Sequence, residues 1–216
     1  MEQPQIEHPH PMRRGTTAAK LAKKMGVNIK NATVAIEDGE FYQHKGIRIT
    51  SIIRGTIWAK LTGKKVTGGS TITQQLIKNT LLTSERSITR KMKEWILSVK
   101  LERVMSKEDI LALYLNEAPY GGNIYGVEEA SKTFFGKGAK DVTLAEAAYI
   151  GAIPQAPTFY SPYGVNKDKL DARQKLVLSK MKEFRSSTTQ EIKDIRGEAQ
   201  KFMKATKDSV KTENSA

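Results

Sequence analysis

The chain has 216 residues, of which 38% are hydrophobic and 27% are charged, as is ordinary for a folded domain. Its 36 basic and 23 acidic residues leave a formal net charge of +13, which favours polyanionic partners such as nucleic acid, anionic lipid headgroups or a pyrophosphate-bearing substrate. The absence of cysteine excludes disulfides and thiolate metal sites. No window approaches the ~20 apolar residues of a membrane-spanning helix, so we expect a soluble protein or a chain that lacks its parent's anchor.

The N-terminal part of the chain is predicted to lead from a tail into a helical domain. Residues 1–15 are rich in proline and poor in large apolar groups, which indicates a mobile tail. Residues 16–25 predict a short basic helix. The small apolar segment 31–36 runs directly into Glu37, and the apolar spacing over residues 47–61 predicts a helix.

Helical patterns dominate the rest of the sequence. Gly and Lys content predicts a loop over residues 63–69, after which Ser70 is a candidate N-cap for a helix. The strongest helix is predicted over residues 87–104, with one apolar stripe and basic residues on the other faces. Further helices are predicted over residues 107–115, 128–135, 144–153 and 169–184. No convincing strand is found, so the predicted fold class is mainly α.

Domain organisation follows from these patterns. Residues 1–15 are assigned to a disordered tail and residues 16–186 to one folded domain. Residues 187–216 are polar and sparsely apolar, which predicts a partly disordered extension. Thr188 or Thr189 is a candidate cap for one more helix there.

Acidic residues follow the first apolar segment in the pattern Glu37-Asp38-x-x-Phe41-x-x-His44-x-Gly46. A carboxylate with apolar neighbours tends to have a raised pKa, which suits general acid or base catalysis. The alternative, which spacing alone favours, is an acidic pair at the end of a helix.

A glycine-led helix start follows at residues 68–79. Two glycines before a hydroxyl-rich helix present free backbone N–H groups to an anion, and Gln74 and Lys78 share one helical face. The order of residues is not that of a Walker loop. The alternative is a Gly-Ser cap on a polar helix.

Charged residues recur at a spacing of four on the long predicted helix. Arg86, Arg90 and Glu94 therefore stack on one face, with Lys93 nearby. For an isolated helix, a solvated ladder of salt bridges is the usual explanation of such spacing.

Tyrosines and glycines gather over residues 114–126, which on pattern alone favours a packed aromatic turn. The histidines, His8, His10 and His44, are not spaced as metal ligands. Two of them belong to the tail, and His44 is assigned a structural role.

Taken in order, five blocks of the chain resemble the five motifs of the family-51 glycosyltransferases, the peptidoglycan polymerases of class A penicillin-binding proteins and monofunctional transglycosylases. The blocks are EDGEFYQHKG (37–46), GGSTITQQLIKN (68–79), RKMKEWILSVKLE (90–102), KEDILALYLNEAPYGGNIYG (107–126) and LAEAAYIGAIPQAP (144–157). The match covers most of residues 32–163, and five blocks in this order are far more specific than any one of them.

The resemblance implies a helical, lysozyme-like fold with a larger lobe and a smaller lobe that faces the membrane. It implies that Glu37 is the general base in the polymerisation of lipid II, an inverting transfer that releases polyprenyl pyrophosphate. Glu94 is implied as the second essential carboxylate, which handles the pyrophosphate directly or through a divalent cation, Mg²⁺ or Mn²⁺. No organic cofactor is expected.

The resemblance also implies a set of substrate-binding residues, which are cationic or carry amide and hydroxyl groups. They are Ser70, Gln74, Gln75, Lys78, Arg86, Arg90 and Lys93, with Gln155 as a further candidate. Cations are suited to the charge that develops on a leaving pyrophosphate. The expected partners are lipid II, the growing lipid-linked glycan, an anionic membrane surface and other cell-wall synthesis proteins. The expected place is the extracytoplasmic face of the bacterial cell membrane.

Three alternatives remain from the residues themselves. A lysozyme-like glycan-cleaving enzyme also uses acidic residues beside the bond it breaks, but it needs no cations for a pyrophosphate. A basic helical nucleic-acid-binding protein accounts for the net charge but not for the glutamates, and we expect no nucleic-acid partner. An inactive scaffold with the same fold is disfavoured because both glutamates are present.

Overall fold

A computed structural model describes residues 25–51, 53, 69–82 and 87–187 of the chain. The predicted N-terminal tail, most of the predicted helices at 16–25 and 47–61, and the C-terminal extension lie outside the described residues. Of the helix predicted over 47–61, residues 49–51 and 53 are described and helical.

The described residues form helices joined by loops, and the only β-pairing among them is an isolated antiparallel bridge between Pro119 and Tyr125. The predicted mainly-α fold class is confirmed. The named helices are α2 (Val27–Glu37), α4 (Ile72–Leu81), α5 (Ile88–Val104), α6 (Lys107–Glu117), α7 (Val127–Phe135) and α8 (Leu144–Ala152). Residues 167–187 form a further long helix.

Side-chain caps explain where several helices begin. Ser87 and Ser106 accept backbone N–H groups at the starts of α5 and α6, and Thr143 forms a reciprocal capping box with Glu146 at α8. At α4 the prediction of Ser70 as the cap is wrong, because Thr71 is the N-cap and forms a capping box with Gln74. The sequence holds a signal for this, because Gln74 stands three residues after Thr71 whereas Thr73 stands three residues after Ser70. The Thr71 hydroxyl also donates to the Gly46 carbonyl at 2.7 Å.

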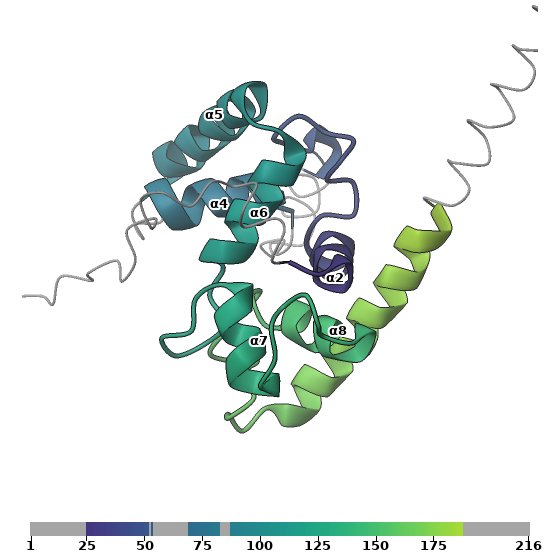
Figure 1. Cartoon of the computed structure of the whole chain (residues 1–216). Helices are drawn as coiled ribbons and strands as arrows, with labels where there is room; N and C mark the ends of the chain where they lie inside the picture. The colour runs from purple at the N-terminus through teal and green to yellow at the C-terminus, as the bar shows by residue number, and fades with distance from the viewer. Residues whose placement is uncertain (1–24, 52, 54–68, 83–86, 188–216) are drawn as a thin grey trace, which may run out of the picture.

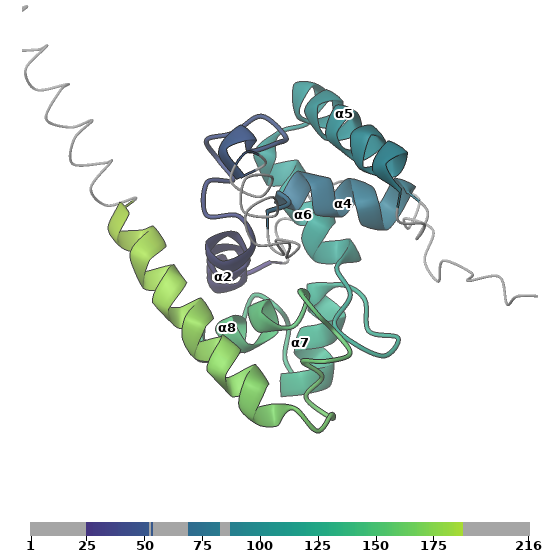
Figure 2. The same ribbon diagram turned by 180° about the vertical axis from the view of Figure 1, so that it is seen from behind.

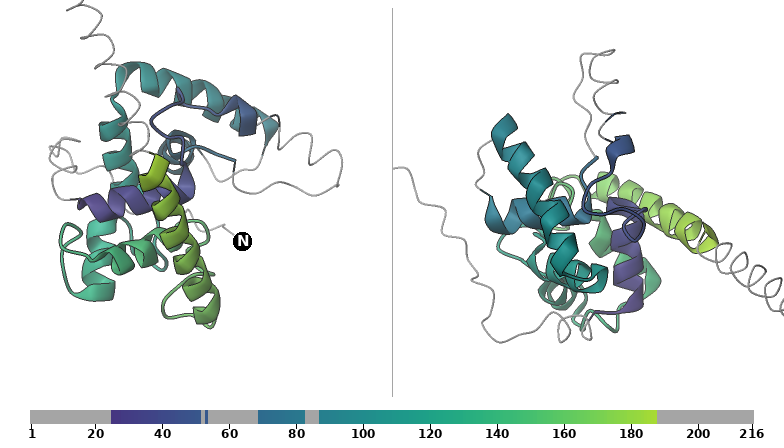
Figure 3. Two further views of the ribbon diagram at one scale, coloured as in Figure 1. Left: turned by 90° about the vertical axis from the view of Figure 1, so that its right-hand side faces the viewer. Right: turned by 90° about the horizontal axis from the view of Figure 1, so that it is seen from above.

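The helices are arranged in two groups joined by α6 (Figure 1). Helices α4 and α5 lie side by side at one end, whereas α7 and α8 lie at the other. The same arrangement is seen from behind in Figure 2, where the helix of residues 167–187 runs along the flank beside α8. In the left panel of Figure 3 this helix crosses α2. A segment late in the sequence is thus brought to α2, whose last residue is Glu37.

The main hydrophobic core is built from side chains of α2, α4, α6, α7, α8 and the helix of residues 167–187. Its largest side chains with almost no exposure include Ile29, Leu111, Leu115 and Ile150. The apolar segment 31–36 lies in helix α2 and is mostly buried, on the helix that packs against α8. Burial of such apolar surface is the principal stabilising contribution to the fold.

Helix α5 is oriented differently from what an apolar stripe indicates. Ile88, Met92 and Ile96 are each more than half exposed, while the buried residues of the helix are Glu94 and Ser98. The polar residues Glu94 and Ser98 therefore face the molecule, whereas much of the apolar stripe is exposed. Among the described residues, no helix is long and apolar enough to span a membrane.

Candidate functional site

Glu37 is the last residue of α2, and contacts from two other helices hold its carboxylate. Gln75 of α4 donates to Glu37 Oε2 at 2.9 Å. Arg173, from the helix of residues 167–187, places Nη2 3.7 Å from Glu37 Oε1. Oε1 itself is buried and has no hydrogen bond within the described part of the chain. Oε2 is therefore held by Gln75, whereas Oε1 has a free lone pair that can accept a proton.

The surroundings of Glu37 raise the pKa of its carboxyl group above the usual 4.5. Burial is the largest cause, because it penalises the charged form, and Asp38 acts in the same direction. The hydrogen bond from Gln75 and the positive charges of Arg173 and Lys78 oppose the rise. A carboxylate balanced in this way can exchange a proton closer to neutral pH than an exposed glutamate.

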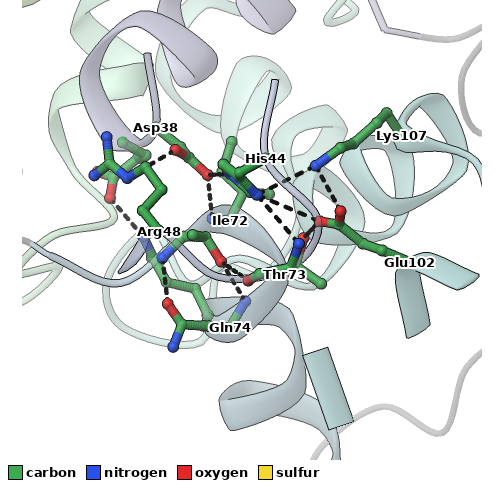
Figure 4. A network of polar contacts seen from close by, with 12 residues as sticks. Asp38, His44, Arg48, Ile72, Thr73, Gln74, Glu102 and Lys107 are labelled. Atoms are coloured by element: carbon green, nitrogen blue, oxygen red, sulfur yellow. Dashed lines mark hydrogen bonds and ion pairs between the residues drawn. The ribbon is translucent and has the colours of Figure 1, made fainter. Parts of the chain in front are cut away.

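Asp38, the next residue, is fully buried and has a structural role. Its Oδ2 accepts the backbone N–H of Ile72 at 3.0 Å and lies 2.8 Å from His44 Nε2, while Arg48 Nε lies 3.5 Å from its Oδ1 (Figure 4). Asp38 thereby ties the end of α2 to the first turn of α4. These contacts hold Glu37 beside Gln75.

His44 connects Asp38 to a second ion pair (Figure 4). Its Nδ1 accepts a hydrogen bond from the backbone N–H of Gly46 at 3.2 Å, and Lys107 Nζ lies 3.4 Å from the same nitrogen. Nδ1 is therefore unprotonated, and Nε2 carries the hydrogen that it donates to Asp38. Lys107 also pairs with Glu102 at 2.7 Å. The expectation that His44 is structural agrees with these contacts.

The loop that carries this network approaches α5 so closely that only glycine fits. Gly46 has φ +93°, and a Cβ at this position would lie 2.7 Å from the backbone of Ser98. Ser98 lies one helical turn beyond Glu94. The close contact brings the segment after Glu37 against the helix that carries the second predicted carboxylate.

Glu94 forms the second part of the site, where α5 faces the start of α4. Its side chain is almost completely buried and forms an ion pair with Lys91 Nζ. The same ammonium group donates to Ser70 Oγ at 3.0 Å. Ser70, Lys91 and Glu94 therefore form one polar cluster between the two helices.

Lys78 of α4 links the two carboxylates electrostatically. Partial desolvation lowers the pKa of the Lys78 ammonium group; Arg90 and Lys91 lower it further, whereas Glu94 and Glu37 raise it. The charges of Glu37 and Glu94, and of Arg90 and Lys91 on α5, therefore all act on the Lys78 ammonium group. The guanidinium Nε of Arg90 is buried and has no hydrogen-bond acceptor among the described residues. Within the described residues, the site therefore combines a carboxylate oxygen, Glu37 Oε1, and a guanidinium nitrogen, Arg90 Nε, that are both buried and without a hydrogen bond.

The structure brings most, but not all, of the predicted site residues together. Gln74 is buried and its Oε1 accepts the Thr71 N–H at 2.8 Å, so this amide oxygen serves the helix cap. Lys93 is exposed on the outer side of α5, and Gln155 is exposed in the loop after α8. Arg86 lies outside the described residues. The substrate roles of these residues stay predictions.

Two residues of the site were not identified from the sequence. Lys91 stands within the RKMKE block, where the spacing of four drew attention to Arg90 instead. The (i, i+3) spacing from Lys91 to Glu94 was an available signal. Arg173 lies beyond the five blocks, and no local pattern distinguishes it. Its guanidinium also donates from Nε to the Ala152 carbonyl at 2.9 Å, which fixes its position beside Glu37.

Comparisons with known proteins agree with this geometry. The family model described as Transglycosylase matches residues 7–182. Penicillin-binding protein 1A of Clostridium tetani is 48% identical over 163 residues, which are 72% of this chain and 21% of that protein. Penicillin-binding protein 1A of Clostridium perfringens (strain 13 / Type A) is 47% identical over 175 residues, which are 77% of this chain and 26% of that protein. Penicillin-binding protein 1F of Bacillus subtilis is 44% identical over 153 residues, which are 71% of this chain and 21% of that protein.

The chain spans about a fifth to a quarter of the length of these curated relatives. The matched family region includes all the named helices, and with them both glutamates and the cations Lys78, Arg90 and Lys91. The chain belongs to the transglycosylase family, and the predicted resemblance to peptidoglycan glycosyltransferases is confirmed.

Proposed function

We propose that this chain polymerises lipid II into glycan strands by inverting transfer, with Glu37 as the general base. The observation that carries the proposal is the buried Oε1 of Glu37, which has no hydrogen bond within the described residues while Gln75 holds Oε2. Such an atom can accept the proton of a substrate hydroxyl. The raised pKa of Glu37 makes this proton transfer more favourable near neutral pH.

In the proposed reaction, Glu37 removes the proton from the 4-hydroxyl of the incoming disaccharide. That oxygen attacks the anomeric carbon of the growing chain, the bond to the pyrophosphate oxygen breaks, and the configuration inverts. Polyprenyl pyrophosphate leaves with the bonding electron pair. Lys78, Arg90 and Lys91 are the cations suited to stabilise its charge.

A divalent cation remains a candidate cofactor near Glu94. Lys91 already occupies one side of this carboxylate, and the described residues contain no group of three or more potential metal ligands. Mg²⁺ often binds through one or two carboxylates plus substrate phosphates, so a cation here would depend on the pyrophosphate itself for ligands. No step of the proposed reaction is routed through it.

The test of the function is conversion of lipid II by the purified chain in detergent. Polymerisation predicts longer glycan together with released polyprenyl pyrophosphate. A glycan-cleaving enzyme would instead shorten preformed glycan and release no pyrophosphate. Glycan shortening without growth would therefore overturn the proposal in favour of hydrolysis.

The outer face of α5 supports a further part of the proposal, which is contact with an anionic membrane surface on the extracytoplasmic side of the bacterial cell membrane. Its exposed apolar side chains lie among exposed basic residues, whereas the acidic residues of α5, Glu94 and Glu102, are buried in ion pairs. The exposed residues are Ile88, Met92, Ile96, Val104, Lys93, Lys100 and Arg103. An apolar stripe flanked by cations alone is typical of a helix lying at a membrane interface.

Replacing Ile88 and Ile96 together by serine is expected to weaken binding to vesicles that contain phosphatidylglycerol by about tenfold, because two inserting side chains are lost. Co-sedimentation with vesicles measures the change. The matched control is serine at Val165 and Leu176, two exposed apolar residues remote from α5 in sequence. Equal binding by all three proteins would remove α5 from the membrane contact.

A further inference from the structure

Tyr114 of α6 stands at the start of a chain of hydrogen bonds that ends at Glu37. Its side chain is almost completely buried, with 1% relative exposure. The Tyr114 hydroxyl lies 3.2 Å from Gln75 Oε1, and Gln75 Nε2 lies 2.9 Å from Glu37 Oε2. Three helices, α6, α4 and α2, are therefore connected through one amide group.

The direction of each hydrogen bond follows from the chemistry of the groups. An ionised carboxylate can only accept, so Gln75 must turn its N–H₂ toward Glu37. Its carbonyl oxygen then faces Tyr114, whose hydroxyl can donate to it. The reversed amide would place its oxygen against the carboxylate, with two acceptors facing each other. Only one orientation of Gln75 satisfies both neighbours.

We propose that Tyr114 is a positioning residue for the general base, because its hydroxyl holds the Gln75 amide in the orientation that donates to Glu37. The inference rests on the proposed role of Glu37 and adds a residue that sets its proton affinity. The hydrogen bond from Gln75 stabilises the ionised carboxylate and so opposes the effect of burial. Loss of the fixed amide orientation raises the pKa of Glu37 further.

The surroundings of Tyr114 keep its hydroxyl able to donate. Burial is the main cause that raises the pKa of this phenol well above 10.0, and the charge of Glu37 acts in the same direction. The hydroxyl therefore stays protonated over the pH range of an enzyme assay. Tyr120 provides a comparison: it is equally buried and also feels the charge of Glu37, yet it makes no hydrogen bond to Gln75 or Glu37.

The experiment compares Tyr114→Phe with the matched control Tyr120→Phe, and measures kcat and KM for lipid II polymerisation as a function of pH. Each change removes one buried hydroxyl, but only Tyr114→Phe releases the Gln75 amide. We expect the acid limb of the Tyr114→Phe profile to shift upward by about 0.5 pH unit, with kcat at low pH reduced several-fold and KM within about twofold. Tyr120→Phe should leave the limb in place.

A double-mutant cycle with Gln75→Leu shows whether Tyr114 acts through the amide. Gln75→Leu alone is expected to shift the acid limb by about 1 pH unit, because the carboxylate loses its donor completely. Tyr114→Phe should add nothing in the Gln75→Leu background. An additional shift in that background would overturn the proposal, as would an unshifted limb or loss of folding in Tyr114→Phe.

The titration of Glu37 can also be followed without turnover. The side-chain carboxyl resonance of Glu37 in protein labelled with ¹³C-glutamate, assigned by its absence in Glu37→Gln, should titrate at higher pH in Tyr114→Phe than in the parent. Full activity of Glu37→Gln would refute the proposed base itself. A Glu37→Gln variant without activity, combined with an unshifted Tyr114→Phe titration, would refute only the positioning role.

Discussion

Glu37→Gln is expected to lower the rate of lipid II polymerisation at least about 100-fold. The substitution keeps the size of the side chain and a hydrogen-bonding partner for Gln75, but it removes the group that accepts the hydroxyl proton. The rate is measured as kcat/KM in detergent at a pH where the parent is fully active. Because burial raises the pKa of Glu37, activity of the parent should fall with decreasing pH before an exposed glutamate would be protonated.

Glu40→Gln is the matched control for this change. Glu40 lies three residues further along the same segment and is exposed, so its replacement should leave the rate within about twofold. Equal polymer formation by the parent and Glu37→Gln would exclude Glu37 as the base and direct attention to Glu94. Loss of activity in both variants would instead indicate that the segment tolerates no change of charge.

Lys91→Met is expected to reduce kcat/KM about 30-fold, whereas Lys93→Met should change it less than about threefold. The two residues stand in the same helix, but Lys91 contacts Ser70 and Glu94 while Lys93 is exposed on the outer side. A cation inside the site can stabilise the leaving pyrophosphate, and one outside it is screened by water. Initial rates of pyrophosphate release measure the difference.

The control for Lys91→Met is Lys91→Arg, which keeps the positive charge beside Glu94. Methionine leaves the buried carboxylate of Glu94 without its cation, so the thermal unfolding temperature of each variant must be compared before the rates are interpreted. Recovery of at least half of the activity in Lys91→Arg would support a role of charge. Equal losses in Lys91→Met and Lys93→Met would support the predicted substrate role of Lys93.

Local patterns were sufficient for the fold class and for the starts of several helices. Helices over residues 87–104, 107–115 and 144–153 were predicted close to their observed bounds, because hydroxyl caps and helical periodicity depend on neighbouring residues. The order of the five motif blocks was sufficient for the family, and with it for the choice of Glu37 and Glu94. Both side chains have little exposure in the structure and lie beside cations, and their catalytic roles stay predictions.

Tertiary contacts decided what periodicity leaves open. A helical stripe states which residues share a face, but not whether that face meets the core or solvent, and α5 turns Glu94 inward and Ile96 outward. The cap of α4, by contrast, had a local signal, because Thr71 with Gln74 three residues later matches a capping box and Ser70 with Thr73 does not.

The sequence by itself determined the helical class and the family, since these depend on residue identity and on order along the chain. The catalytic roles of Glu37 and Glu94 stay predictions. Only the tertiary structure decided that Arg173 lies against Glu37, that Tyr114 bonds to Gln75 and that Lys91 bonds to Ser70. These contacts join helices that are distant in sequence or depend on which side of a helix faces its neighbour. Packing of the whole chain, rather than any local preference, decides which distant helices meet and which side of each helix faces its neighbour.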